Sequence, residues 1–301
     1  MNEFITYSKS GVREIRNYEK SDVPFVLYPD MTKNRGAIFS VNKHRDIELL
    51  YLTAGKLKIH LDNEVFYAEK NNVVVVNSDV LHNIIPLTDS VTYDCIIIDK
   101  NFFESHGLGL SNVHIKEIIR DEAVNKNISC IKEIMTIRKA KYYVAEVFLR
   151  LIDMSVKLLE NYSIEKESNQ NTNASLATIE RGIEYIHKHF NDCITVDDVS
   201  AYSGYSKFHF CRCFKEITGH TVINYINMQK IKYAKNMLEK SSATVTEIAE
   251  MCGFNSATYF ATVFKKYTGY SPSEVKIQDA ESNETSSFQG RKTKQASLYP
   301  L

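Results

Sequence analysis

The sequence predicts an α+β protein of two domains, an N-terminal antiparallel β-barrel with flanking helices followed by an all-α domain. Three observations lead to this prediction. Short segments rich in β-branched and aromatic residues follow one another at intervals of about ten residues over 36–99. From about residue 110 the apolar residues recur with a helical period. The helical region also contains an internal repeat, and 301 residues are enough for two cores.

Composition excludes several classes of protein. Lys and Arg number 37, as do Asp and Glu, so the net charge of zero gives no argument for a nucleic-acid partner. No apolar run approaches the roughly 20 residues of a membrane-spanning helix, and the N-terminus lacks the apolar stretch of a secretory signal. The six cysteines have neither disulfide nor zinc spacing. We therefore expect a cytoplasmic protein with no membrane partner.

The expected barrel occupies residues 1–110. Its predicted strands are separated by turn residues such as Gly, Asn and Asp, a pattern typical of an antiparallel sandwich or small barrel. These strands are Ile47–Leu52, Lys56–Leu61, Val65–Ala68, Val73–Val76 and Tyr93–Ile98.

The later boundaries follow changes of period and composition. Residues 111–162 carry an apolar stripe with helical spacing and are expected to form helices. Residues 163–175 are polar and aperiodic, which predicts a linker. Residues 176–277 are helical in pattern throughout, and the Ser-rich segment 278–301 is expected to be disordered.

The internal repeat is the most informative feature of residues 176–277. The segment TVDDVSAYSGY from Thr195 aligns with TVTEIAEMCGF from Thr244 at an offset of 49 residues. After one extra residue, the pattern S-x3-F-x3-F-K-x2-T-G follows from both Ser206 and Ser256. Each copy combines N-cap residues, a glycine where the turn requires positive φ, and phenylalanines at i, i+4. The sequence therefore predicts two helix-turn-helix motifs joined by a long helix.

The second helix of each copy should present an exposed face that suits DNA. Arginine can hold guanine through two hydrogen bonds, and lysines contact phosphates. The alternative is that these residues are ordinary solvated charges of a helical bundle. A long helix over 223–238 would hold the two faces about 34 Å apart, the spacing of successive major grooves. The exposed set is Lys207, Phe208, Cys211, Arg212 and Lys215 in the first copy, and Thr258, Thr262, Lys265 and Lys266 in the second.

Residues 176–277 closely resemble the DNA-binding domain of AraC/XylS-type transcription regulators. The resemblance includes SGYSKFHFCRCFKEITGH and IAEMCGFNSATYFATVFKKYTGYSP, whose closing GYSP is highly specific for that family. It implies double-stranded promoter DNA as a partner, and RNA polymerase as another if the protein is an activator. It also implies a set of base contacts. These come from Phe208, Cys211, Arg212, Thr258 and Thr262.

Two N-terminal stretches resemble the sequence motifs of cupin barrels. The first, G-x5-N-x-H-x3-E-x6-G, contains Asn42, His44 and Glu48, and the second, NNVVVVNSDVLHN, contains His82. Metal-dependent cupin enzymes have His, His, Glu and His at these positions, so the three that remain here could hold iron. The resemblance to AraC-type regulators instead implies a sensor barrel. There these residues and Tyr51 would bind a small polar effector without a metal.

The combined expectation is a DNA-binding transcription regulator and not an enzyme. The barrel would bind a small-molecule effector without any cofactor, and a polar lining with aromatic flanks suits a carbohydrate. Residues 111–162 would mediate the formation of a homodimer. Two alternatives remain open. One is a metal-dependent cupin enzyme fused to a DNA-binding module, and the other is a constitutive DNA-binding protein whose barrel binds only another protein.

Overall fold

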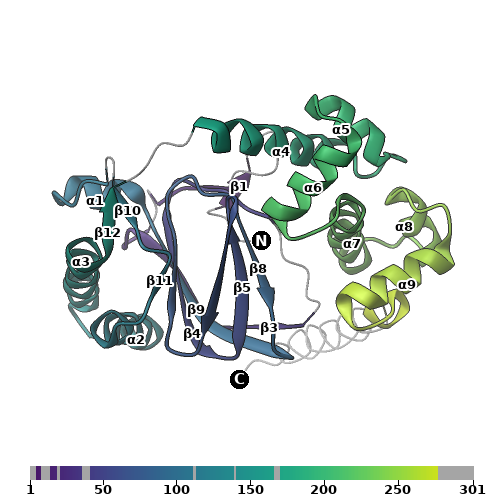
Figure 1. Cartoon of the computed structure of the whole chain (residues 1–301). Coiled ribbons are helices and arrows are strands. Elements are labelled where there is room, and N and C mark those ends of the chain that lie inside the picture. Colours follow the sequence, from purple (N-terminus) through teal and green to yellow (C-terminus); the bar gives the residue numbers. More distant parts are fainter. Residues whose placement is uncertain are drawn as a thin grey trace, which may run out of the picture. The chain divides into compact units, whose positions relative to one another are not determined.

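A computed structural model gives the arrangement of the chain (Figure 1). It describes residues 5–7, 14–18, 21–35, 41–110, 113–138, 140–165 and 170–276. The expected tail 278–301 and the start of the first cupin motif, 36–40, lie outside these residues. No helix in the described ranges is both long and apolar enough to cross a membrane. The chain divides into two compact units, Met1–Lys188 with Val196–Val222, and His189–Thr195 with Ile223–Leu301.

Two antiparallel sheets form the predicted N-terminal barrel. The strands are β3 (Phe25–Asn34), β4 (Ile47–Ala54), β5 (Lys56–Leu61), β6 (Glu64–Glu69), β7 (Val73–Val76), β8 (His82–Pro86), β9 (Ser90–Ile98) and β11 (Ile118–Ile119). One sheet has the order β11-β7-β4-β9-β3 and the other the order β6-β5-β8. The bounds predicted for β5 and β7 are confirmed, whereas β3 and β8 were not predicted. A bulge between Tyr28 and Met31 interrupts the pairing of β3 with β9, which obscures the strand pattern.

The two faces of the five-stranded sheet bury different residues because side chains alternate along a strand. Leu49 of β4 packs on one face, in a core shared with helices α2 (Glu122–Ile137) and α3 (Tyr143–Tyr162). Leu50 packs on the other face, in a core shared with the three-stranded sheet. Glu48 therefore belongs to the face between the sheets, and Tyr51 to the face covered by helices.

The helical segment begins later than predicted. Two short strands, β10 (Val113–Ile115) and β11, precede α2, and α1 (Lys100–Ser105) lies within the predicted barrel range. Asp121 starts α2 by accepting hydrogen bonds from the backbone N–H groups of Ala123 and Val124. Val147, Leu151, Ser155 and Leu158 of the predicted apolar stripe of α3 are buried. Met154, which was not part of that prediction, is buried as well.

The polar stretch 163–175 is more regular than the predicted linker. β12 (Ser163–Glu165) pairs with β10, and α4 (Gln170–His189) begins inside the stretch. The pairing of Ile164 with His114 joins residues 50 positions apart, which composition and local period cannot indicate.

Both helix-turn-helix motifs are present. The helices are α5 (Val196–Ser203), α6 (Lys207–Thr218), α7 (Val222–Lys240), α8 (Val245–Met251) and α9 (Ala257–Thr268). The turn glycines have the predicted positive φ, 78° at Gly204 and 70° at Gly253. Thr244 forms the predicted capping box with Glu247. Ser206 occupies the N-cap position of α6 but makes no capping hydrogen bond through its side chain, so that expectation is wrong.

The division into units does not follow the predicted domain boundary at residue 176. Helices α5 and α6 belong to the same unit as the barrel, and α8 and α9 to the other. Helix α6 is grouped with the barrel because backbone carbonyls in its last turn accept hydrogen bonds from two barrel residues. His60 Nδ1 lies 2.9 Å from the carbonyl oxygen of Glu216, and Asn83 Nδ2 lies 2.8 Å from that of Thr218.

Candidate effector site and nucleic-acid interface

Three of the predicted effector residues meet between the two sheets. His44 Nε2 lies 3.0 Å from Glu48 Oε2, and His82 Nε2 lies 3.2 Å from the same oxygen. The centroids of the two imidazole rings are 5.0 Å apart, and all three side chains are buried. The structure therefore brings together residues that are up to 38 positions apart in the sequence, as the motif resemblance predicted.

Local structure fixes each member of this cluster. Glu48 points between the sheets from β4, while His44 precedes that strand and His82 begins β8. The second ring nitrogen of each histidine is held by a backbone carbonyl. His44 Nδ1 lies 3.0 Å from the oxygen of Asp46, and His82 Nδ1 lies 3.1 Å from that of Val80. Both Nε2 atoms are thereby directed at the carboxylate.

Asn42 joins this arrangement through its backbone. Its N–H donates to the carbonyl of His82 at 3.0 Å and its carbonyl accepts from the N–H of His82 at 2.9 Å. This isolated bridge places the start of β8 beside the residues that lead into β4. Asn42 therefore positions His82, and its own side chain is only half-buried.

Glu48 carries the negative charge of this cluster. Burial raises the pKa of its carboxyl group, but hydrogen bonds from His44 and His82 outweigh burial and hold that pKa well below its usual range. For His82 burial lowers the pKa, and the hydrogen bond to Glu48 outweighs it and raises the pKa. The other carboxylate oxygen accepts a hydrogen bond from Cys95 Sγ at 3.2 Å. Burial and the charge of Glu48 raise the pKa of this thiol, which keeps it a neutral donor.

Sequence reasoning missed the polar residues beside this cluster. Arg16, from the short strand β2 (Glu14–Arg16), forms ion pairs with Glu14 and with Asp46, whose Oδ2 lies 3.6 Å from Arg16 Nη1. Tyr18 donates a hydrogen bond to Asp46 at 3.1 Å. Asp46 lies between two motif residues, so spacing could have indicated it. Arg16 lies in no recognised motif, so nothing in the sequence around it indicated a role in this site.

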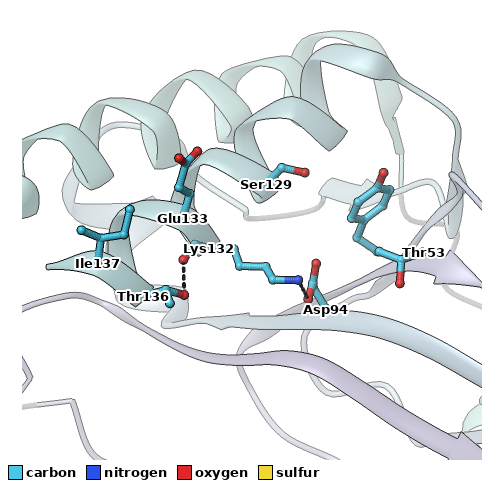
Figure 2. Close-up of a pocket in the computed structure, with 8 residues that line it drawn as sticks. Thr53, Asp94, Ser129, Lys132, Glu133, Thr136 and Ile137 are labelled. Carbon is cyan, nitrogen blue, oxygen red and sulfur yellow. Dashed lines mark hydrogen bonds and ion pairs between the residues drawn. The ribbon is translucent and has the colours of Figure 1, made fainter.

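Tyr51 does not join the cluster. It lies on the helix-covered face of β4, opposite to Glu48, because the two residues are three positions apart. There it lines a cavity of about 520 Å³ between the sheet and α2. Figure 2 labels the seven other residues that line this cavity. The predicted effector set is thus divided between the two faces of one sheet.

The cluster has the donor set of a transition-metal site. The ligand atoms of His44, Glu48 and His82 all lie within 4.8 Å of one another. Two imidazole nitrogens and one carboxylate oxygen suit iron or zinc, and the carbonyls that hold both Nδ1 atoms leave Nε2 available to a metal. A metal held there would give effector oxygens a Lewis-acidic centre. Without one, the same atoms hydrogen-bond to each other directly.

The first helix-turn-helix motif presents the expected face. Phe210, Phe214 and Ile217 are buried, while 89% of the surface of Phe208 is exposed. Arg212, Lys207 and Lys215 are exposed and Cys211 is half-buried.

Two exposed charged residues of this first face contact other side chains of the protein. Lys207 Nζ lies 2.7 Å from Asp197 Oδ2 in an exposed ion pair. Exposed ion pairs of this kind contribute little to stability. Arg212 Nη2 lies 3.4 Å from His209 Nδ1, also at the surface.

The second motif repeats this division. Phe260 and Phe264 of α9 are buried, and the four predicted contact residues Thr258, Thr262, Lys265 and Lys266 are exposed. Tyr259 is 53% exposed on the same helix and was not predicted. Counted from the equivalent serines Ser206 and Ser256, Tyr259 corresponds to His209 and Phe208 corresponds to Thr258, so the position of Phe208 did not indicate it.

A polar cluster between two sheets and two helix-turn-helix motifs define a ligand-responsive, DNA-binding transcription regulator. Residues 32–152 match the AraC-like ligand binding domain, and residues 199–278 match a helix-turn-helix domain. The uncharacterized HTH-type transcriptional regulator in the cgkA 5'region of Pseudoalteromonas carrageenovora is 35% identical over 122 residues, covering 40% of this chain and 72% of that protein. The chain belongs to the AraC/XylS family of transcription regulators.

Two further comparisons cover most of the chain. The uncharacterized HTH-type transcriptional regulator YdeC of Bacillus subtilis is 22% identical over 280 residues, 88% of this chain and 96% of that protein. Among solved structures, ToxT from Vibrio cholerae, bound to (E)-4-(8-methylnaphthalen-1-yl)but-3-enoic acid, aligns with a TM-score of 0.41 and 17% identity. That alignment covers 84% of this chain and 98% of that chain.

Proposed function

We propose that a small polar effector binds beside His44, Glu48 and His82 and thereby changes the binding of promoter DNA. The observation that carries this proposal is a set of buried polar atoms without hydrogen-bond partners. Among the described residues, Arg16 Nε and Asp46 Oδ1 are such atoms. Buried polar groups in proteins are nearly always paired, so these two favour a polar occupant.

A carbohydrate fits this mixture of groups. The Arg16 guanidinium can only donate hydrogen bonds, and the Asp46 carboxylate can only accept them. A sugar hydroxyl does both, so neighbouring hydroxyls could satisfy the two atoms at once. Tyr51 is not part of this proposal because it lies on the other face of the sheet.

The effector proposal is tested by DNA binding. DNA fragments that bind the full chain are selected first, and a panel of sugars is then screened for a change in affinity. Glu48→Gln should abolish the response, because a neutral amide cannot hold both imidazoles as the carboxylate does. Glu64→Gln, an exposed carboxylate of β6, is the matched control and should respond like the unaltered chain. A full response in a folded Glu48→Gln protein would contradict the proposal, and thermal melts of both variants verify folding.

For the DNA interface, we propose base contacts from α6 and α9. Arg212 would read guanine, and the exposed lysines would contact phosphates. The remaining base contacts are proposed for Phe208, Cys211, Thr258 and Thr262, on the strength of their places in the two matched helices. The support is the burial of the phenylalanines at i, i+4, which leaves these side chains on the free face of each helix.

We propose further that the protein acts as a homodimer in the cytoplasm, with RNA polymerase as a partner if it activates transcription. The exposed side of α3 supports a dimer, because it carries Leu149, which is 70% exposed, beside charged residues. We propose no catalytic activity, since the two relatives named above are transcription regulators and His44, Glu48 and His82 already hydrogen-bond to one another.

A further inference from the structure

A second polar site lies on the helix-covered face of the five-stranded sheet. At the centre of this face the strands carry apolar residues that pack on α2, but toward one end they carry Tyr51, Thr53 and Asp94. The apolar packing stops there, and a cavity of about 520 Å³ opens between the strands and α2. Figure 2 shows Lys132 extending from the helix to Asp94 across this space.

Three of the four hydroxyl groups that line this cavity, those of Thr53, Ser129 and Thr136, already donate their hydrogens to backbone carbonyls. Thr53 Oγ1 donates to the carbonyl of Thr92 at 3.1 Å, and Thr136 Oγ1 donates to that of Lys132 at 2.8 Å. Ser129 Oγ likewise donates to a backbone carbonyl of α2, at 3.0 Å. A hydroxyl has one hydrogen and two lone pairs, so each of these groups can now only accept a hydrogen bond.

The charges of the cavity add further acceptors. Lys132 Nζ lies 2.8 Å from Asp94 Oδ1 and 2.6 Å from Asp30 Oδ1, so one ammonium serves two carboxylates. Glu133 lines the same cavity, is exposed, and has no ion-pair partner among the residues that the structure describes. Of the charged residues in the lining, Asp94 and Glu133 outnumber Lys132, so the lining has an excess of negative charge. Even with the Tyr51 hydroxyl as a donor, the carboxylate and hydroxyl oxygens give it more acceptors than donors.

We propose that this cavity binds a small molecule that carries a primary ammonium group on an apolar body. An ammonium has three hydrogens to donate and no acceptor, which complements Glu133 and the hydroxyl oxygens. The Tyr51 ring and the Ile137 side chain, which is 52% exposed, offer apolar contact, and the ring can also attract a cation. The volume falls within the range of small-molecule sites. This site goes beyond the proposed effector site, which lies on the other face of the sheet.

The test compares two probes with the same body. Calorimetric titration of the full chain with phenethylamine should show saturable binding, and 2-phenylethanol, in which a hydroxyl replaces the ammonium, should bind about tenfold more weakly. Glu133→Gln should weaken the amine about tenfold and leave the alcohol unchanged. Glu104→Gln, an exposed carboxylate of α1 outside the cavity, is the matched control and should bind both probes like the unaltered chain. Thr136→Val, which removes one acceptor, should weaken the amine by a smaller factor.

Equal binding of the two probes, or amine binding that Glu133→Gln does not change, would overturn the proposal. Glutamine is a good helix former and position 133 is exposed, so this variant is expected to fold. Failure here is separate from failure of the proposed function, because the sugar response of DNA binding is measured without either probe and depends on Glu48.

Discussion

Arg212 shows how the burial of neighbours assigns a role to one side chain. It lies on α6 between Phe210 and Phe214, which are both fully buried, and is itself exposed. A helix turns by about 100° per residue, so a residue two positions from each phenylalanine lies on the opposite face. The arginine can therefore reach a base edge without disturbing the core.

Arg212→Ala should reduce affinity for the selected DNA by about 1–3 kcal/mol and relax the preference at one base pair. Lys265→Ala, proposed as a phosphate contact, should instead weaken all sequences alike and lower the salt dependence by about one counterion. Competition binding with base-substituted sites at several salt concentrations measures both effects. Unchanged affinity and base preference in Arg212→Ala would show that the assigned helix face is wrong.

The two copies of the repeat differ at the start of their helices. Thr244 and Glu247 satisfy each other's backbone N–H groups at the start of α8, at 2.6 Å and 3.2 Å. Ser256 accepts a hydrogen bond from the N–H of Tyr259 at 3.3 Å, whereas Ser206 makes no such bond. Similar sequence thus gives equivalent helices with unequal capping.

This difference predicts unequal effects of alanine. Thr244→Ala should lower the free energy of unfolding by about 1 kcal/mol, the usual cost of a lost N-cap. Ser206→Ala should change it by less than about 0.5 kcal/mol, because no capping bond is lost. Urea titrations followed by circular dichroism measure both values. A larger loss from Ser206→Ala than from Thr244→Ala would contradict this interpretation.

At the scale of the whole molecule, the question is whether the helical domain needs the barrel in order to fold. The hydrogen bonds from His60 and Asn83 to the end of α6 are made to backbone carbonyls. Water can replace such bonds when the barrel is removed, whereas the phenylalanine packing within each motif is retained.

The fragment 176–277 should therefore fold alone. We expect it to be helical and to bind the selected DNA as a monomer, more weakly than the full chain. Circular dichroism and DNA titration of the fragment, with the full chain as control, measure this. A fragment that stays unfolded would show that α5 and α6 depend on the barrel.

Effector sensing should not require a metal. Asn42 replaces one of four metal ligands, and its amide is a poor ligand for iron or zinc. Purified protein is expected to contain well under one equivalent of iron, zinc, manganese or nickel, and chelation should leave the effector response intact. Elemental analysis and DNA binding before and after chelation decide this. Stoichiometric metal whose removal erases the response would favour a metal-dependent sensor at His44, Glu48 and His82.

The sequence by itself determined the features that depend on local pattern. Helical period, cap residues and positive-φ glycines repeat at 49 residues, so they predicted both helix-turn-helix motifs without any knowledge of contacts. Segments rich in β-branched and aromatic residues, separated by turn residues, predicted most strands of the barrel. Motif spacing also predicted the meeting of His44, Glu48 and His82, because such spacing encodes strand positions within a known barrel.

Only the tertiary structure decided which side chains share a space. It brought Arg16 to Asp46, 30 positions away. The opposite faces of Tyr51 and Glu48, by contrast, follow from their separation of three positions on one predicted strand. The tertiary structure also formed the cavity beside Lys132, which is lined by residues of β4, β9 and α2. These outcomes depend on which strands pair and which helix covers the sheet. Those choices are set by burial of the whole apolar surface, and no local segment of the sequence contains that information.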